Sequence, residues 1–285
     1  RDLHSFPTRR SSDLAMGLDK YAPPGSYNGI VAAAQVGFES CIGIPKFTSD
    51  GVAVEFHDDG NISSAMAQTD GSAIPSADDK PISQLTYDEL MQYSIGSPVD
   101  SVFADAKILK IDDFFRICAE TGMRPIFSIH SADAPTDAEW QTLKTMADKY
   151  GLTKYLSVKF GGRSPSIVGQ VINTFGNGGL YSLILLYAGD DSTAISDRIS
   201  TLVNTYGLDT SKTRLDCEFF EADVFADSTS AWQQAQIASA RSAGYTVSAV
   251  LDSGSGATTD GIRDLMNLGV TEFTDFRMYS LGLNW

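Results

Sequence analysis

The chain has 285 residues, of which 42% are hydrophobic and 20% are charged, enough for one large domain or two smaller ones. Its formal net charge of −15 argues against nucleic acid or an anionic membrane as a partner, because phosphate binding depends on clustered Lys and Arg. Cys41, Cys118 and Cys217 each lie in an apolar run, which favours buried free thiols over disulfides or a zinc site. No apolar run is long enough to span a bilayer.

Residues 1–14, RDLHSFPTRRSSDL, resemble the translated read-through of a sequencing adapter, as found at the ends of metagenomic reading frames. We therefore expect this segment to be a non-native scar, and residues 15–285 to form a single domain whose natural N-terminus is truncated. With a truncated N-terminus, both a cytoplasmic and a secreted location stay open.

Helical and strand-like patterns alternate from residue 26 onward, which is typical of a parallel sheet built from βα units. Residues 26–36 predict a small, alanine-rich helix, and residues 41–44 predict a buried strand. The pair Asp50-Gly51 lies between two alternating segments and predicts a hairpin. The returning strand of this hairpin brings His57 and Asp58 back beside residues 42–44.

Residues 58–107 are polar and irregular, and we expect an elaborated loop with a short helix at residues 87–93. The later alternation predicts helices at 112–121, 137–150, 166–175, 194–206, 229–243 and 258–268, and strands at 124–129, 155–160, 181–187, 214–220, 245–251 and 271–274. With residues 41–44 this makes seven strands, one short of a (β/α)8 TIM barrel. We expect residues 11–16 to fill the position of the first strand.

In barrels of this kind the chemistry lies on loops that follow the carboxyl ends of the strands. His57 is there either an acid/base or an ordinary ribbon residue that is hydrogen-bonded to the backbone. His130 either joins His57 and Glu218 in a transition-metal site or is a partly exposed structural histidine.

Positive charge at the same end of the barrel is expected from Lys159 and Arg163, which either bind an anion or belong to a solvated loop. Glu218 is a buried carboxylate in need of a partner if the strand alternation turns it inward. Lys159 is the nearest candidate for that partner.

Five segments resemble the glycerophosphodiester phosphodiesterase family in order and spacing: GLDKYAPPGS, FTSDGVAVEFHD, LTYDELMQYSIG, ILKIDDFFRICAETG and RPIFSIHS. The segment GVTEFTD is similar to the closing strand of that family. The resemblance implies one TIM barrel with a β-hairpin and a long loop after the second strand. It also implies phosphodiester hydrolysis in lipid metabolism, with two histidines, an arginine and a Ca²⁺ or Mg²⁺ ion held by carboxylates.

Most of the family's functional positions carry other residues in this sequence. The His-Arg pair falls on Ala15-Met16, the first-loop Glu on Pro24, the second-strand carboxylates on Ile42 and Ile44, and the third-strand Glu and Lys on Ser128 and His130. His57, followed by Asp58, retains the family residue. Since Ca²⁺ and Mg²⁺ require oxygen ligands, we expect no metal cofactor.

We therefore expect a pseudoenzyme that serves as a binding or structural module, with a protein partner or a small phosphorylated or polyol ligand at the barrel mouth. The alternative is an active phosphoric diester hydrolase on glycerophosphodiesters, with a site rebuilt from His57, His130, Lys159 and Glu218.

Overall fold

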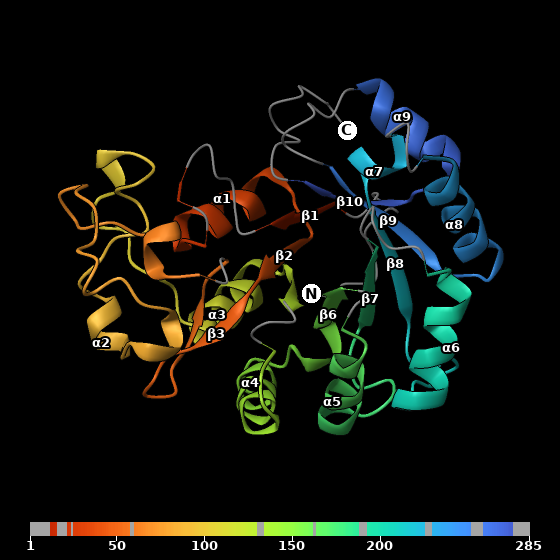
Figure 1. Ribbon diagram of the computed structural model, residues 1–285, viewed down its shortest axis with the longest axis horizontal. Coiled ribbons are helices and arrows are strands. Elements are labelled where there is room, and N and C mark those ends of the chain that lie inside the picture. The colour runs from red at the N-terminus through yellow and green to blue at the C-terminus, as the bar shows by residue number, and fades with distance from the viewer. Residues whose placement is uncertain are drawn as a thin grey trace.

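The computed structural model describes residues 12–15, 22–23, 25–57, 60–129, 134–161, 164–187, 193–225, 230–251 and 259–275. Within this part of the chain, parallel strands close into a barrel in the order β1-β10-β9-β8-β7-β6-β5-β2. Figure 1 shows these strands around one centre with the helices outside them. The α/β fold with a parallel sheet of βα units, predicted from the alternating patterns, is confirmed.

The barrel strands are β1 (Ser12–Ala15), β2 (Ser40–Gly43), β5 (Arg124–Ile129), β6 (Ser157–Gly161), β7 (Ser182–Tyr187), β8 (Leu215–Phe220), β9 (Thr246–Leu251) and β10 (Glu272–Asp275). The helices are α1 (Tyr27–Val36), α2 (Tyr87–Leu90), α3 (Ile111–Thr121), α4 (Asp137–Lys149), α5 (Ser166–Phe175), α6 (Ile195–Tyr206), α7 (Glu221–Phe225), α8 (Ser230–Ser242) and α9 (Thr259–Leu268). The strand expected at 155–160 begins only at Ser157, because residues 153–155 form a 3₁₀ turn.

Strand β1 occupies the position that was expected for residues 11–16. Its Leu14 pairs in parallel with Cys41 of β2 on one side and with Asp275 of β10 on the other. The helix that follows, α1, begins where the hydroxyl of Ser26 accepts a hydrogen bond of 3.1 Å from the amide of Gly29.

Side chains along each strand alternate between two environments. Those that face outward, such as Cys41, Phe127, Val158 and Phe219, join the main hydrophobic core between the barrel and its helices. Helix α3 contributes the buried residues Phe114, Phe115, Ile117 and Cys118 to this core, as its sequence pattern predicts. The inward positions instead carry a mixture of aliphatic and polar side chains. This mixture determines which ligands and ions the barrel interior can bind.

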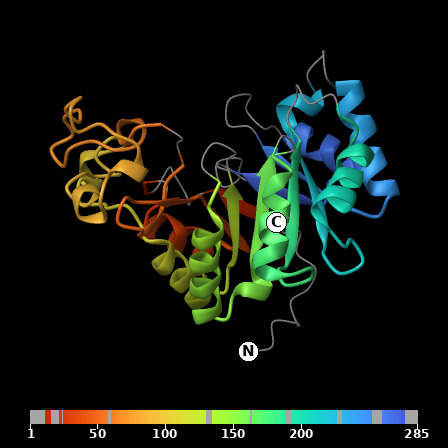
Figure 2. The same cartoon turned by 60° about the horizontal axis from the view of Figure 1, so that its bottom comes forward.

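Residues 45–108, called the insertion below, leave the barrel after β2. They begin with an antiparallel ribbon of β3 (Pro45–Phe47) and β4 (Ala53–Glu55), in which Pro45 pairs with Glu55. Gly51 turns the ribbon with a φ of 79°, which favours glycine. Figures 1 and 2 both show the insertion extending to one side of the barrel.

The insertion has a hydrophobic core of its own. This core consists of Val54, Phe56, Ile62, Met66, Ile74, Ile82, Leu85, Leu90, Ile95 and Ile108. The sequence pattern predicted only an irregular polar loop with one short helix, because these apolar residues are spaced without a helical or strand period. The helix is also shorter than expected and ends at Leu90.

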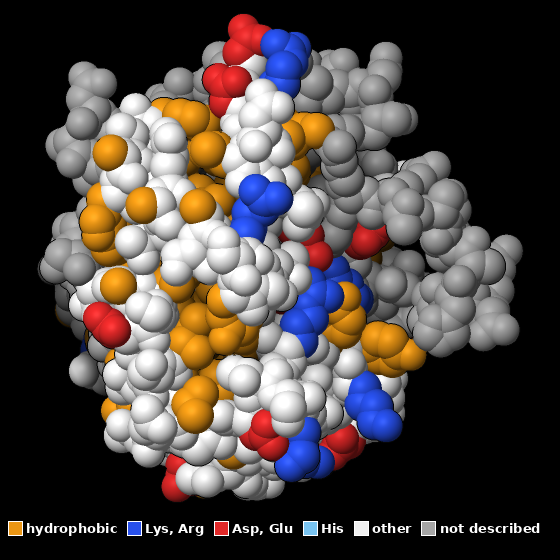
Figure 3. All heavy atoms as spheres, turned by 90° about the vertical axis from the view of Figure 1, so that its right-hand side faces the viewer, with side chains coloured by type: hydrophobic (Ala, Val, Ile, Leu, Met, Phe, Trp, Pro, Cys, Tyr) orange, Lys and Arg blue, Asp and Glu red, His pale blue; other side chains and the backbone are white. Residues whose placement is uncertain are grey.

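The outer face of the molecule that carries α6, α8 and α9 is shown in Figure 3. Acidic and basic side chains lie beside each other on its described part, where neither sign gathers into one patch. None of the described helices combines the length and the apolar character needed to cross a membrane.

Candidate functional site

The carboxyl ends of parallel strands meet at one end of a barrel, which is called the mouth below. At the opposite end lies Arg214, which precedes β8. Its guanidinium donates hydrogen bonds to Asp216 at 2.8 Å, to Glu272 at 3.0 Å and to the hydroxyl of Tyr181 at 2.7 Å. These residues lie at or just before the first residues of their strands. In barrels of this kind ligands bind at the carboxyl ends of the strands, so a ligand is expected at the mouth.

Four isoleucines form one buried cluster inside the barrel: Ile42, Ile44, Ile126 and Ile184. They face inward because their strand neighbours Cys41, Phe127 and Leu183 belong to the outer core. Ile42 of β2 pairs directly with Ile126 of β5. Strands β2, β5 and β7 and the residue after β2 therefore contribute apolar side chains to the barrel interior.

This isoleucine cluster does not fit a Ca²⁺ or Mg²⁺ site. Ile42 and Ile44 stand where the family resemblance places two carboxylates, and Ser128 stands where it places a third. Hydrocarbon side chains offer no oxygen to a hard cation, and one hydroxyl offers neither the charge nor the number of ligands. Within the described ranges, no three His, Cys, Asp or Glu side chains are grouped so that they could hold a metal ion.

An ion pair between β6 and β8 also lies in the barrel interior. The ammonium of Lys159 on β6 contacts Oε2 of Glu218 on β8, and the hydroxyl of Thr274 on β10 donates to Oε1 at 2.6 Å. Lys159 is only 6% exposed and Glu218 only 1%. Two partners therefore compensate the buried Glu218 carboxylate. The expectation that Glu218 points inward with Lys159 as its partner is confirmed.

Lys159 also borders the isoleucine cluster. In the sheet register it lies between Ser128 of β5 and Ile184 of β7. Lys159 therefore neighbours Ser128, which stands at the position of the third-strand carboxylate. Sequence reasoning did not single out Thr274, whose position next to a carboxylate depends on a strand pairing that the sequence alone does not give.

His57 is exposed at the end of the ribbon, in contrast to the buried ion pair. The amide of Phe56 donates to the carbonyl of Ile44 at 3.0 Å, which brings His57 back beside Gly43, as the reflected hairpin sequence predicts. In the structure, Lys159 therefore contacts Glu218 inside the barrel, whereas His57 is exposed at the end of the ribbon. Asp58, His130, Arg163, Met16 and Pro24 lie outside the described residues, and of Ala15 and Glu221 only the backbone is described.

Glu55 is a buried carboxylate that sequence reasoning missed. It is 5% exposed, and burial raises the pKa of its carboxyl group to about 7. Its Oε1 accepts a hydrogen bond of 3.3 Å from the amide of Ile44. Ala53 and Glu55 share one face of β4, and Ala53 is part of the main core. The sequence does not show which face of this strand is buried, since Val52, Val54 and Phe56 on the other face are apolar.

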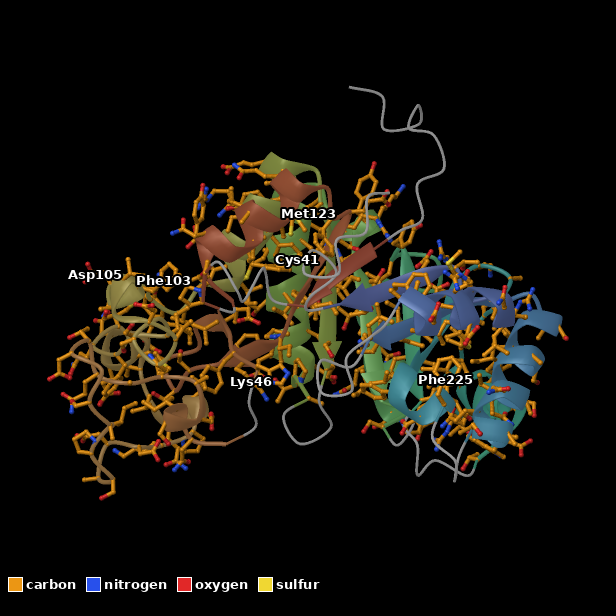
Figure 4. The ribbon with its side chains drawn as sticks, turned by 90° about the horizontal axis from the view of Figure 1, so that it is seen from above. Cys41, Lys46, Phe103, Asp105, Met123 and Phe225 are labelled. Carbon is orange, nitrogen blue, oxygen red and sulfur yellow. The ribbon has the colours of Figure 1, made fainter. Side chains whose placement is uncertain are left out.

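Lys46 of β3 is a second buried lysine near this end of the barrel. Figure 4 shows Lys46 on the ribbon, between the barrel and the outer part of the insertion, where Phe103 and Asp105 lie. Phe225 lies in the opposite half of the barrel. The insertion thus brings Lys46, Glu55 and His57 to the β2 side of the mouth.

No protein-family model matches the sequence, and no curated protein matches it either. Solved structures match nearly the whole chain. A glycerophosphodiester phosphodiesterase from Agrobacterium tumefaciens is 12% identical, with a TM-score of 0.68 over 94% of this chain and 97% of that one. A glycerophosphoryl diester phosphodiesterase from Parabacteroides distasonis is 13% identical, with a TM-score of 0.68 over 97% of this chain and 87% of that one.

A phosphodiesterase from Oleispira antarctica, solved in complex with the product sn-glycerol-3-phosphate, is 16% identical. Its TM-score is 0.68, and the match covers 95% of each chain. At such identities the likeness establishes the fold. The chain has the fold of the glycerophosphodiester phosphodiesterases.

Proposed function

We propose that this chain is a non-hydrolytic relative of the glycerophosphodiester phosphodiesterases, which binds a small phosphorylated or polyol ligand at its barrel mouth without a divalent cation. The observation that carries the proposal is the isoleucine cluster. Ile42 and Ile44 pack against Ile126 and Ile184 at the positions where the resemblance places metal ligands.

Loss of those carboxylates removes the largest source of catalytic charge. Hydrolysis of a phosphodiester develops negative charge on the phosphoryl oxygens, and preorganised positive charge is usually the largest catalytic contribution. Lys159 borders the cluster, but Glu218 already neutralises it. A neutral pair of this kind offers much less stabilisation to a developing phosphoryl charge than a divalent ion.

A phosphorylated ligand remains compatible with the mouth. A structural neighbour of this chain was solved with sn-glycerol-3-phosphate. In this chain, Lys159 and Arg163 are the proposed contacts for the phosphate, with Glu218 holding Lys159 in place. Binding an anion requires less charge than stabilising its transition state, so loss of turnover and retention of binding are consistent with each other.

Calorimetry and turnover measurements test this proposal together. We expect sn-glycerol 3-phosphate to bind with the same affinity in EDTA, Mg²⁺ and Ca²⁺, and glycerophosphodiesters not to be hydrolysed in any of them. Thermal unfolding in the same buffers should show no stabilisation by either cation. Turnover that EDTA abolishes and that disappears in His57→Ala would refute the proposal.

The second candidate is an active hydrolase with a rebuilt site of His57, His130, Lys159 and Glu218. The ion pair inside the barrel favours it, since it supplies a positioned ammonium group and a carboxylate. Turnover of glycerophosphodiesters with Mn²⁺ or Zn²⁺, and its loss in both His57→Ala and Lys159→Met, would establish this alternative.

We also propose that residues 1–14 are a non-native scar and that residues 15–285 form one domain. The resemblance of RDLHSFPTRRSSDL to adapter read-through supports this. Sequencing the intact gene across this junction tests it, and a continuous native reading frame through residues 1–14 would contradict it.

A further inference from the structure

Glu55 lies between two backbone segments at the rim of the mouth. Its carboxylate reaches the amide of Ile44, which directly follows β2, and it also lies against Gly25, in the segment between β1 and α1. Ile44 directly follows the carboxyl end of β2, and Gly25 belongs to the connection from the neighbouring strand β1 to α1. The carboxylate is thus held at the same end of the barrel as the proposed ligand.

The buried carboxylates of Glu55 and Glu218 near the mouth differ in how far they are compensated. Glu218 has the ammonium of Lys159 and the hydroxyl of Thr274. Among the described residues, the carboxylate of Glu55 accepts one hydrogen bond, of 3.3 Å, from the Ile44 amide. A buried carboxylate with so few partners is costly to the fold, and such groups are concentrated at functional sites. Burial raises the pKa of Glu55 to about 7, in line with this poor compensation.

Gly25 preserves the space for this carboxylate. Its φ of 68° lies in the left-handed region, and a Cβ atom there would collide with Oε2 of Glu55. The preceding residue, Pro24, stands where the family resemblance places a glutamate. Position 24 thus carries no carboxylate, but the carboxylate of Glu55 lies against the next residue, Gly25.

We propose that Glu55 accepts hydrogen bonds from the hydroxyl groups of the ligand, and that it makes the mouth select a polyol phosphate over a bare phosphate. This inference rests on the proposed binding function. A carboxylate is an acceptor with two oxygens, and its hydrogen bonds to hydroxyl groups are charge-assisted. A phosphate would be repelled by it, so Glu55 contacts the polyol part while Lys159 faces the phosphate.

Calorimetry at pH 8 with sn-glycerol 3-phosphate and inorganic phosphate tests this assignment. We expect Glu55→Gln to weaken binding of sn-glycerol 3-phosphate by about ten- to a hundredfold, the range for loss of a charge-assisted hydrogen bond, and to leave phosphate binding within about twofold. Glu120→Gln, which removes an exposed carboxylate on α3, is the matched control and should change neither affinity. Glu55→Asp keeps the charge on a shorter side chain and should give an intermediate loss.

The assignment is overturned if Glu55→Gln binds both probes like the wild type, or if it weakens both equally, as a purely structural role would. Thermal unfolding of each variant identifies misfolding, and if neither Glu55→Gln nor Glu55→Asp folds, the role of Glu55 is structural. A wild type that binds neither probe refutes the proposed function as well. A wild type that binds both, with unchanged Glu55 variants, refutes this inference alone.

Discussion

The ammonium of Lys159 and the carboxylate of Glu218 meet inside the barrel from two strands that are separated by β7. Thr274, their third partner, lies on β10, which is again separated from β8 by one strand, β9. Side chains from alternate strands form the interior layers of TIM barrels. The ion pair is therefore part of such a layer, with polar groups in place of the branched hydrocarbons that usually fill it.

Breaking this pair should destabilise the protein strongly. Lys159→Met leaves the Glu218 carboxylate buried without its cation, and we expect a loss of about 3–5 kcal/mol in the free energy of unfolding, measured by urea denaturation. The double variant Lys159→Met/Glu218→Met should lose less than the sum of the two single variants. Additive losses would show that the two groups are not coupled.

Glu55 should make stability depend on pH. Its pKa of about 7 in the folded protein exceeds the ordinary value of 4.5, so the folded state binds the proton more tightly than the unfolded chain does. The contribution of Glu55 to stability is therefore highest below about pH 4.5 and is lost as the pH rises to about 7.

Glu55→Gln removes this dependence. At about 1.4 kcal/mol per pKa unit, the free energy of unfolding of Glu55→Gln minus that of the wild type should grow by about 2–3 kcal/mol from pH 5 to pH 8. Urea denaturation at both values measures this growth. Desolvation is the main cause of the shift and no charged side chain contributes to it, so a difference that is constant with pH would show that Glu55 is better solvated than its burial indicates.

A single carboxylate returned to the isoleucine cluster should not restore cation binding. Ile44→Asp buries a charge among Ile42, Ile126 and Ile184, and we expect it to cost about 3 kcal/mol or more, against about 1 kcal/mol for the control Ile44→Val. Because Ile42 and Ser128 still supply no carboxylate, Ca²⁺ should leave the melting temperature of Ile44→Asp unchanged. A calcium-dependent rise in that temperature would contradict this prediction.

The separate core of the insertion should open independently of the barrel. Leu90→Ala removes a fully buried side chain from that core, at an expected local cost of about 2–5 kcal/mol. Hydrogen exchange should accelerate at amides in residues 60–107 and stay unchanged in β6 and β7. Equal acceleration in the barrel strands would show that the two cores unfold together.

The barrel was predictable because its signals are regular. Strands such as residues 182–187 are short continuous apolar runs, and helices such as residues 111–121 repeat apolar residues at the helical period. The core of the insertion was not predictable, since Ile62, Met66 and Ile74 follow no period and are brought together by turns.

The candidate site was predictable only in part. The partnership of Lys159 with Glu218 follows from strand alternation, which turns both side chains inward. Glu55 was missed because its burial depends on the backbone of Ile44 and Gly25. Neither residue has a polar side chain that would suggest a contact with a carboxylate.

Strand β1 closes the barrel through its main chain. Four residues, Ser12–Ala15, join β2 to β10 through main-chain hydrogen bonds, which any sequence without proline can supply. Without them, both neighbouring strands would present free edges that invite pairing with another molecule. Protection of these strand edges thus depends on main-chain pairing, whereas the proposed choice of ligand depends on single side chains of the mouth.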